Sequence, residues 1–212
     1  MRLLCYVLWS LFAGLPAQAQ SGKPGEFEYY VLSLSWSPNW CQLTGDARGD
    51  PQCDAGRGLT FIAHGLWPQY KVGYPSDCVT TETDPSRSDT AAMADIMGGA
   101  GLAFHEWKKH GRCSGLSSDA YFNTLRRAYA NVTIPPLFAK MTSDLKVPAL
   151  VIQDAFLESN PALAAENVTV TCDGAMIEEV RICLNKDLSP RVCGMYEDRD
   201  CTLQDAELDA PR

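Results

Sequence analysis

Three histidines, the only ones in the 212-residue chain, stand in two short segments beside other side chains that move protons or bind anions. His64 is followed by a glycine and Trp67, while His105 and His110 enclose the sequence Glu-Trp-Lys-Lys. A lone histidine is usually a core or surface residue. Because all the histidines here lie among Trp, Glu and Lys, the sequence favours a functional site. Two histidines can act as a general acid and base, and cations beside them can bind phosphate oxygens.

The second segment places its ionisable side chains on one wall if it is helical. At 100° per residue, with His105 at zero, Lys109 lies at about 40°, Glu106 at about 100° and His110 at about 140°. Trp107, at about 200°, can turn into the core. Lys109 and His110 would occupy the last helical turn, where the helix dipole favours positive charge. This wall suits a substrate that carries a phosphate.

A zinc hydrolase is the competing interpretation of the same segment. The His-Glu pair at 105–106 is similar to the start of the H-E-x-x-H zinc motif, which places its histidines four residues apart on one helix face. Here His105 and His110 are five apart and point about 140° away from each other. No two cysteines form the close C-x-x-C pair of a zinc site. The sequence therefore favours a site without metal or cofactor.

The elements that position these residues mix helices and strands without regular alternation, which predicts an α+β fold. Residues 59–64 read as a strand ended by Gly65 and Pro68, and residues 101–111 as a helix ended by Gly111. Residues 80–90 read as a surface loop. A helix capped by Ser117 or Ser118 is expected to bury an apolar stripe. Further strands are expected at 27–36, 168–172, 176–184 and 191–193, and a further helix at 148–159.

The first 19 residues have the anatomy of a secretory signal peptide. Arg2 is followed by the apolar run Leu3 to Leu15 and by the small-x-small sequence Ala17-Gln18-Ala19. A membrane anchor is the alternative, but the apolar run is short for a bilayer span. We expect cleavage near Ala19, leaving residues 20–212 as one catalytic domain in the periplasm or outside the cell.

Cysteine count and charge narrow the function classes. Of the nine cysteines, Cys5 lies in the signal peptide, and the remaining eight suggest four disulfides in an oxidising compartment. Counting alone leaves 105 pairings open. The net charge of −8 argues against nucleic-acid binding through a broad basic surface. It leaves open an enzyme that holds one phosphate locally.

Two longer segments resemble a known family. FIAHGLWP, residues 61–68, and FHEWKKHGRC, residues 104–113, are similar to the two active-site segments of the ribonuclease T2 family. Trp36-Ser37-Pro38 before Cys41, and Glu179-Val180 before Cys183 and Cys193, resemble its flanking strands. The resemblance implies a central antiparallel sheet with packed helices, four disulfides and an exported endoribonuclease that needs no metal.

The resemblance also implies residue roles and disulfides. His110 would be the general base and His64 the general acid, with a 2′,3′-cyclic phosphate as product, which some members hydrolyse further. The other implied roles are transition-state stabilisation by Glu106 and Lys109, phosphate binding by His105, and base binding by Trp67 and, more weakly, Tyr74 and Gln69. The implied disulfides are Cys78–Cys113, Cys172–Cys201 and Cys183–Cys193, which leaves Cys41–Cys53.

A different class of function remains open at this point. A catalytically silent, exported RNA-binding protein could use the same scaffold. The intact set of His64, Glu106, Lys109 and His110 argues against it. We therefore expect a monomeric enzyme that acts on single-stranded RNA and has no membrane partner.

Overall fold

The computed structural model describes residues 19–194 and 200–212. The predicted signal peptide therefore lies outside the described residues, except for Ala19. Within these ranges no helix is both long and apolar enough for a membrane crossing. The described strands are β1 Ala19–Ser21, β2 Tyr29–Trp36, β3 Phe61–Gln69, β4 Tyr74–Ser76, β5 Leu145–Val147, β6 Val168–Asp173, β7 Met176–Leu184 and β8 Ala206–Leu208.

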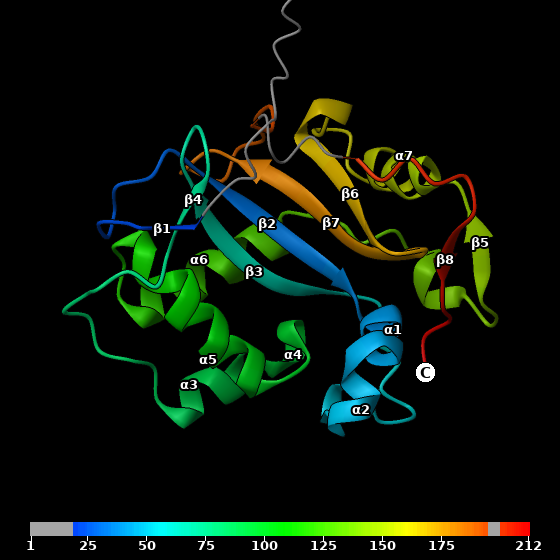
Figure 1. Cartoon of the computed structure of the whole chain (residues 1–212), viewed down its shortest axis with the longest axis horizontal. Coiled ribbons are helices and arrows are strands. Elements are labelled where there is room, and N and C mark those ends of the chain that lie inside the picture. The colour runs from blue at the N-terminus through cyan, green and yellow to red at the C-terminus, as the bar shows by residue number, and fades with distance from the viewer. Residues whose placement is uncertain (1–18, 195–199) are drawn as a thin grey trace, which may run out of the picture.

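Helices cover the sheet from its sides (Figure 1). The α-helices are α1 Ser37–Trp40, α2 Asp46–Arg48, α3 Arg87–Ala92, α4 Ala94–Met97, α5 Ala100–Lys109, α6 Ser118–Ala130 and α7 Ala149–Ser159. A π-helical turn, η1 Cys41–Gly45, joins α1 to α2, and the 3₁₀ turns are η2 Pro51–Cys53, η3 Gly111–Ser114, η4 Phe138–Lys140 and η5 Ala165–Asn167. Figure 1 shows α3 to α6 gathered beside β3, with α7 near β6.

The main sheet has the strand order β3-β2-β7-β8-β5, and β6 also pairs with β7. Its ladders are antiparallel except for the short contact between β7 and β8. The α+β fold with a central antiparallel sheet is thus confirmed. Because β3 is an edge strand, it pairs with β2 on one side only. Its other side can therefore pack against the helices.

Strand β2 separates two buried layers. Tyr30, Leu32, Leu34 and Trp36 point into the main core, which explains their alternation in the sequence. The opposite face carries Tyr29 and Val31, then Ser33 and Ser35, and all eight positions of β2 are buried. The two serines leave room on this second face, close to the centre of the sheet.

The expected strand at 59–64 is longer than predicted. Strand β3 continues through Gly65 and Pro68 to Gln69, and Pro68 stands opposite Tyr30. Proline lacks an N–H donor and normally ends a central strand, but an edge strand tolerates it because that donor is not needed for a second neighbour. The prediction that Gly65 and Pro68 end the strand was therefore wrong.

The expected helix at 101–111 ends earlier. Helix α5 stops at Lys109, and His110 already has φ of −119° before the 3₁₀ turn begins at Gly111. Gly111 does not end the helix through a left-handed conformation. A Cβ at this position would lie 2.6 Å from the Trp107 ring and 3.0 Å from the Tyr121 ring. Gly111 is needed because the chain passes close to these aromatic side chains.

The other predicted elements agree with the structure to within a few residues, with two corrections. Residues 191–193 form no strand; an isolated bridge joins Leu184 to Pro190 instead. The loop at 80–90 gives way to α3 at Arg87, because Ser86 and Asp89 form a capping box. Ser117 caps α6 as one of the two predicted candidates. The short elements α1, α2, α4, β4, β5 and β8 were not predicted.

All four expected disulfides are present. They join Cys41 to Cys53, Cys78 to Cys113, Cys172 to Cys201 and Cys183 to Cys193. The Cys78–Cys113 disulfide ties the turn after α5 to the segment after β4. A backbone hydrogen bond of 2.8 Å from Asp77 to the carbonyl of Lys109 strengthens the same junction.

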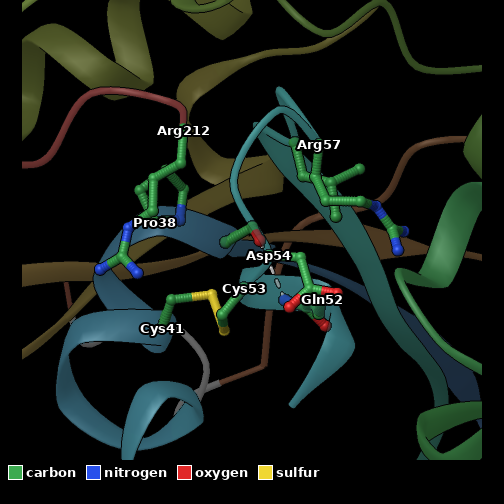
Figure 2. A pocket seen from close by; sticks show the side chains of 9 residues that line it. Pro38, Cys41, Gln52, Cys53, Asp54, Arg57 and Arg212 are labelled. Carbon is green, nitrogen blue, oxygen red and sulfur yellow. Dashed lines mark hydrogen bonds between the residues drawn. A yellow bond between two sulfur atoms is a disulfide. The ribbon is translucent and has the colours of Figure 1, made fainter. Parts of the chain in front are cut away.

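A small pocket lies at the far end of β2, beside the Cys41–Cys53 disulfide (Figure 2). Arg57 and Arg212 flank it, and Arg212 pairs with Asp46 at 2.7 Å. None of the predicted site residues lines this pocket. It belongs to the contact that fastens the last described strand against α1 and α2.

Removing the Cys78–Cys113 disulfide should destabilise the fold. The two cysteines are 35 residues apart, and a loop of that length corresponds to roughly 4 kcal/mol in the chain-entropy model. We expect a loss of that order in the double variant Cys78→Ala, Cys113→Ala, measured by urea unfolding. The matched pair Cys183→Ala, Cys193→Ala opens a 10-residue loop and should cost about 1 kcal/mol less. Unchanged stability in the first variant would contradict this assignment.

Candidate active site

His64 is the extra residue of a β-bulge. Ser33 pairs with Gly65 and Leu34 pairs with Ala63, so His64 has no partner of its own on β2. A bulge bends the strand and can redirect a side chain. The bulge frees His64 from the strict alternation of β3, while Ala63 and Leu66 keep their places in the main core.

Gly65 lets helix α5 approach the strand closely. A Cβ on Gly65 would lie 2.1 Å from Oε2 of Glu106 and 2.4 Å from Nε1 of Trp67. These two atoms form a hydrogen bond of 2.6 Å, with the indole N–H donating to the carboxylate. Glu106 therefore occupies the space that any other residue at position 65 would fill.

Two carboxylates hold His64. Its Nδ1 lies 2.5 Å from Oε1 of Glu179 on β7, and its Nε2 lies 3.6 Å from Oε1 of Glu106. Glu179 also accepts a 2.8 Å hydrogen bond from Nε of Arg181. The His64 side chain is 32% exposed, whereas the two carboxylates are almost completely buried. The buried carboxylates thus hold the His64 ring on its inner side, and the outer side of the ring is open to solvent.

The charges around His64 favour its protonated form. Burial opposes protonation, but the hydrogen bond and charge of Glu179, together with the charge of Glu106, raise the pKa of His64 to about 8. Burial alone would raise the pKa of Glu179 as well. The hydrogen bond and charge of His64, together with Arg181, instead lower the pKa of Glu179 to about 2. At neutral pH the pair is therefore imidazolium and carboxylate.

His110 has the opposite protonation preference. Burial lowers the pKa of His110 to about 3, and the positive charges of Lys109, His64 and His105 act in the same direction. The side chain is buried, and its Nδ1 has no hydrogen-bond partner within the described parts of the chain. At neutral pH His110 is thus an uncharged imidazole that can accept a proton.

Trp67 lies between the two histidines. Its ring stacks on His110 at 5.1 Å with an interplanar angle of 28°, and it meets the edge of His64 at 5.3 Å. The guanidinium of Arg181 lies 5.3 Å from the same ring. Trp67 is only partly buried, so part of the indole remains open to a ligand. It also sets the spacing of the two histidines.

The other predicted site residues differ in how exposed they are and in how close they lie to this cluster. Glu106 is buried, and this burial raises its pKa despite the charges and the hydrogen bond that oppose the shift. His105 is exposed and Lys109 is partly exposed at the end of α5. Tyr74 comes within 6.1 Å of the His110 ring. Gln69 is only 3% exposed, which argues against direct contact with a base in this conformation.

Sequence reasoning missed the roles of Glu179 and Arg181. The resemblance noted Glu179 only as part of a flanking strand, because nothing in the sequence shows which histidine a distant carboxylate will meet. The separation from His64 is 115 residues, and only the pairing of β7 with β2 brings the two together. The one available signal was the group of three charged residues, Glu178, Glu179 and Arg181, within the 176–184 strand.

The described residues also bear on the zinc alternative. Among them, no group of three or more His, Cys, Asp or Glu side chains is arranged to hold a metal ion. His64 lies between Glu106 and Glu179, but its Nδ1 is bonded to Glu179, while Trp67 and Arg181 donate hydrogen bonds to the two carboxylates. Among the described residues we therefore identify no group that would hold a metal ion.

Adding a methyl group at Gly65 should disrupt the contact between β3 and α5. Gly65→Ala forces Glu106 and Trp67 apart, and such overpacking typically costs 1–3 kcal/mol of stability. The matched control is Gly101→Ala in α5, where a Cβ would meet nothing within 4 Å. That change should stabilise the helix by roughly 0.5–1 kcal/mol. Urea unfolding of both variants checks the opposite signs, and equal effects would contradict the close approach.

Comparison with known proteins identifies the family. The ribonuclease T2 family model matches residues 27–193, which include both histidine segments. A ribonuclease from Aeromonas hydrophila is 47% identical over 96 residues, covering 45% of this chain and 42% of that protein. Ribonuclease I from Escherichia coli is 26% identical over 79% of each chain. The chain thus matches less than half the length of the Aeromonas protein.

Solved structures show the same architecture. The RNase-related protein from Calystegia sepium has a TM-score of 0.63 at 21% identity, covering 88% of this chain and 98% of its own. Trichomaglin, an S-like ribonuclease, gives 0.65 at 20% identity, with coverage of 88% and 98%. At such low identity these likenesses describe the fold alone. The family match over residues 27–193, which include both histidine segments, shows that the chain belongs to the ribonuclease T2 family.

Proposed function

We propose that this chain is an endoribonuclease that cleaves single-stranded RNA by metal-independent transphosphorylation. The observation that carries the proposal is the opposite protonation of two histidines around one tryptophan. His64 has a pKa of about 8 and is a proton donor at neutral pH, whereas His110 has a pKa of about 3 and is a proton acceptor. A general acid and a general base are therefore ready in the same cluster.

The reaction follows from these two states. Neutral His110 takes the proton of a ribose 2′-hydroxyl, and the 2′-oxygen attacks the adjacent phosphorus. The bond from phosphorus to the 5′-oxygen breaks, and protonated His64 gives its proton to that oxygen. The products are a 2′,3′-cyclic phosphate end and a free 5′-hydroxyl. In a second step with the roles reversed, water can open the cyclic phosphate to a 3′-phosphate.

Residues at the end of α5 are suited to the extra negative charge of the pentacoordinate phosphate. Lys109 offers a cation there, and the exposed imidazole of His105 lies one helical turn earlier. The family resemblance assigns Glu106 to the same stabilisation, and burial raises the pKa of its carboxyl group. These three residues thus bind and stabilise charge, while His64 and His110 move protons.

The base adjacent to the cleaved bond is assigned to the open part of Trp67. Aromatic side chains stack on any nucleobase, so this contact needs no particular sequence. Tyr74 lies next to His110 and can form a second wall. Gln69 is the weakest member of the predicted set, because its amide is buried and lies 3.5 Å from the backbone carbonyl of Trp67.

The alternative is a silent RNA-binding protein on the same fold. The fold itself does not distinguish the two, since an RNase-related protein shares it. The distinction rests on the buried charges. Burying the carboxylates of Glu106 and Glu179 carries a desolvation cost, and a protein that only binds RNA needs no proton donor beside an uncharged histidine.

We also propose that the protein is exported after cleavage near Ala19 and acts as a monomer. The four disulfides support export, because such bonds persist in oxidising compartments. The N-terminal sequence of protein recovered from the periplasm or medium, and its mass in solution, test both statements.

The mature protein should cleave RNA in excess chelator and leave DNA of the same sequence intact. DNA lacks the 2′-hydroxyl group that attacks phosphorus. The assay compares matched RNA and DNA oligonucleotides with and without chelator, and identifies the 2′,3′-cyclic phosphate by mass spectrometry. Loss of RNA cleavage on chelation would overturn the mechanism, and binding without cleavage would favour the silent protein.

The pH dependence of RNA cleavage should reflect the ionisation of both His64 and His110. Cleavage needs neutral His110 and protonated His64, so kcat/KM should fall below the pKa of His110, about 3, and above that of His64, about 8. His64→Ala and His110→Ala should each lower the rate by about 10² to 10⁴, the usual range for such groups.

Each alanine variant should also remove its own limb of the profile. His64→Ala should lose the alkaline limb and His110→Ala the acid limb. His105→Ala should instead weaken substrate binding and keep both limbs. The role assignment fails if His64→Ala and His110→Ala both retain normal turnover.

A further inference from the structure

We infer that Glu179, held in place by Arg181, is the positioning residue that keeps His64 in the proton-donating state. Its carboxylate is 3% exposed and lies 2.5 Å from Nδ1 of His64. The hydrogen bond on Nδ1 leaves Nε2 as the atom that faces Glu106. The catalytic consequence of this inference rests on the proposed function, but the contact itself can be tested without RNA.

The sheet explains how a side chain from β7 reaches one on β3. Strand β2 lies between them, with Ser35 opposite Glu179 and Ser33 opposite both Arg181 and Gly65. Serine is small, so the longer side chains of β7 can pass over β2. Ser33 is fully buried, and its Oγ has no hydrogen-bond partner within the described residues. Its small size is therefore the property that the site uses.

Arg181 fixes the other end of the carboxylate. Its Nε donates to Oε2 of Glu179 at 2.8 Å, so both carboxylate oxygens have a partner. Its guanidinium also lies over the Trp67 ring. A buried carboxylate held from both sides cannot rotate away from His64. Arg181 therefore links the proton donor to the residue assigned to the base.

The positive charge of Arg181 also acts on the pKa of His64, and it acts in the direction opposite to the charge of Glu179. Within residues 19–194 and 200–212, the charged or titratable groups around His64 are Glu179 and Arg181 on β7, Glu106 on α5 and His110 directly after α5. Glu179 and Glu106 favour the imidazolium, whereas Arg181 disfavours it. Substituting Glu179 and substituting Arg181 should therefore change the pKa of His64 in opposite directions.

The test is an NMR titration of His64 in the folded protein. The chain has only three histidines, so His105→Ala and His110→Ala variants assign the imidazole C2–H signals without ambiguity. We expect the pKa of His64 to fall from about 8 to below its ordinary value of 6.5 in Glu179→Gln, because burial is then opposed only by Glu106. In Arg181→Gln the pKa should not fall.

Two further variants separate charge from general damage. Glu178→Gln removes the neighbouring carboxylate, which is exposed and bonds to Thr171 instead; the pKa of His64 should not change. Glu179→Asp keeps the negative charge on a shorter side chain. The pKa of His64 in this variant should therefore lie between its values in Glu179→Gln and in the wild type. If Glu179→Gln does not fold, the aspartate and Arg181→Gln variants still test the inference.

Cleavage assays give a readout that a purely structural role would not produce. At pH 5 a larger fraction of His64 is protonated than at pH 8, so the rate of Glu179→Gln relative to wild type should be closer to normal at pH 5. At pH 8 it should fall by at least ~10-fold, since each pKa unit changes the protonated fraction about tenfold. Equal losses at both pH values, or equal pKa decreases in the Glu179→Gln and Arg181→Gln variants, would overturn the inference. A wild-type protein that shows the expected titration but no cleavage would instead contradict the proposed function alone.

Discussion

The close approach of helix α5 to strand β3 at Gly65 is the constraint on which the site depends. The Glu106 carboxylate fills the volume where a side chain on residue 65 would stand, and it is held there by the indole N–H of Trp67. The same contact brings the end of α5, with Lys109 and His110, to the second face of the sheet. Without it, the two histidine segments would remain on separate elements with no common cluster.

The cluster shows how burial can give two identical side chains opposite properties. Both histidines lie in surroundings that disfavour charge. His64 has two carboxylates as neighbours, and these outweigh the cost of burial, whereas for His110 burial and the charges of Lys109, His64 and His105 together outweigh the weaker, opposing charge of Glu179. In a medium of low dielectric constant these differences are large. The position of two carboxylates therefore decides which histidine carries a proton.

Contacts outside the cluster hold helix α5 in its orientation. Asp84 accepts hydrogen bonds from the Trp107 indole at 2.8 Å and from Arg112 at 2.7 Å, and so fastens the preceding loop to the back of α5. The Cys78–Cys113 disulfide fixes the end of the same segment. An acidic protein can thus present a few cations at one place, because the scaffold rather than overall charge positions them.

The sequence alone predicted candidate residues for chemistry and the mixture of helices and strands, and, through its resemblance to a family, it predicted the four disulfides. Such features are local: periodicity predicts an element, and two histidine segments of unusual composition stand out from the rest of the chain. Tertiary structure decided what depends on pairing between distant strands. The bulge that redirects His64, the continuation of β3 through Pro68 on a sheet edge, and the meeting of His64 with Glu179 all follow from which strands lie side by side. No short stretch of sequence records that choice, because it reflects how the whole chain buries its apolar faces.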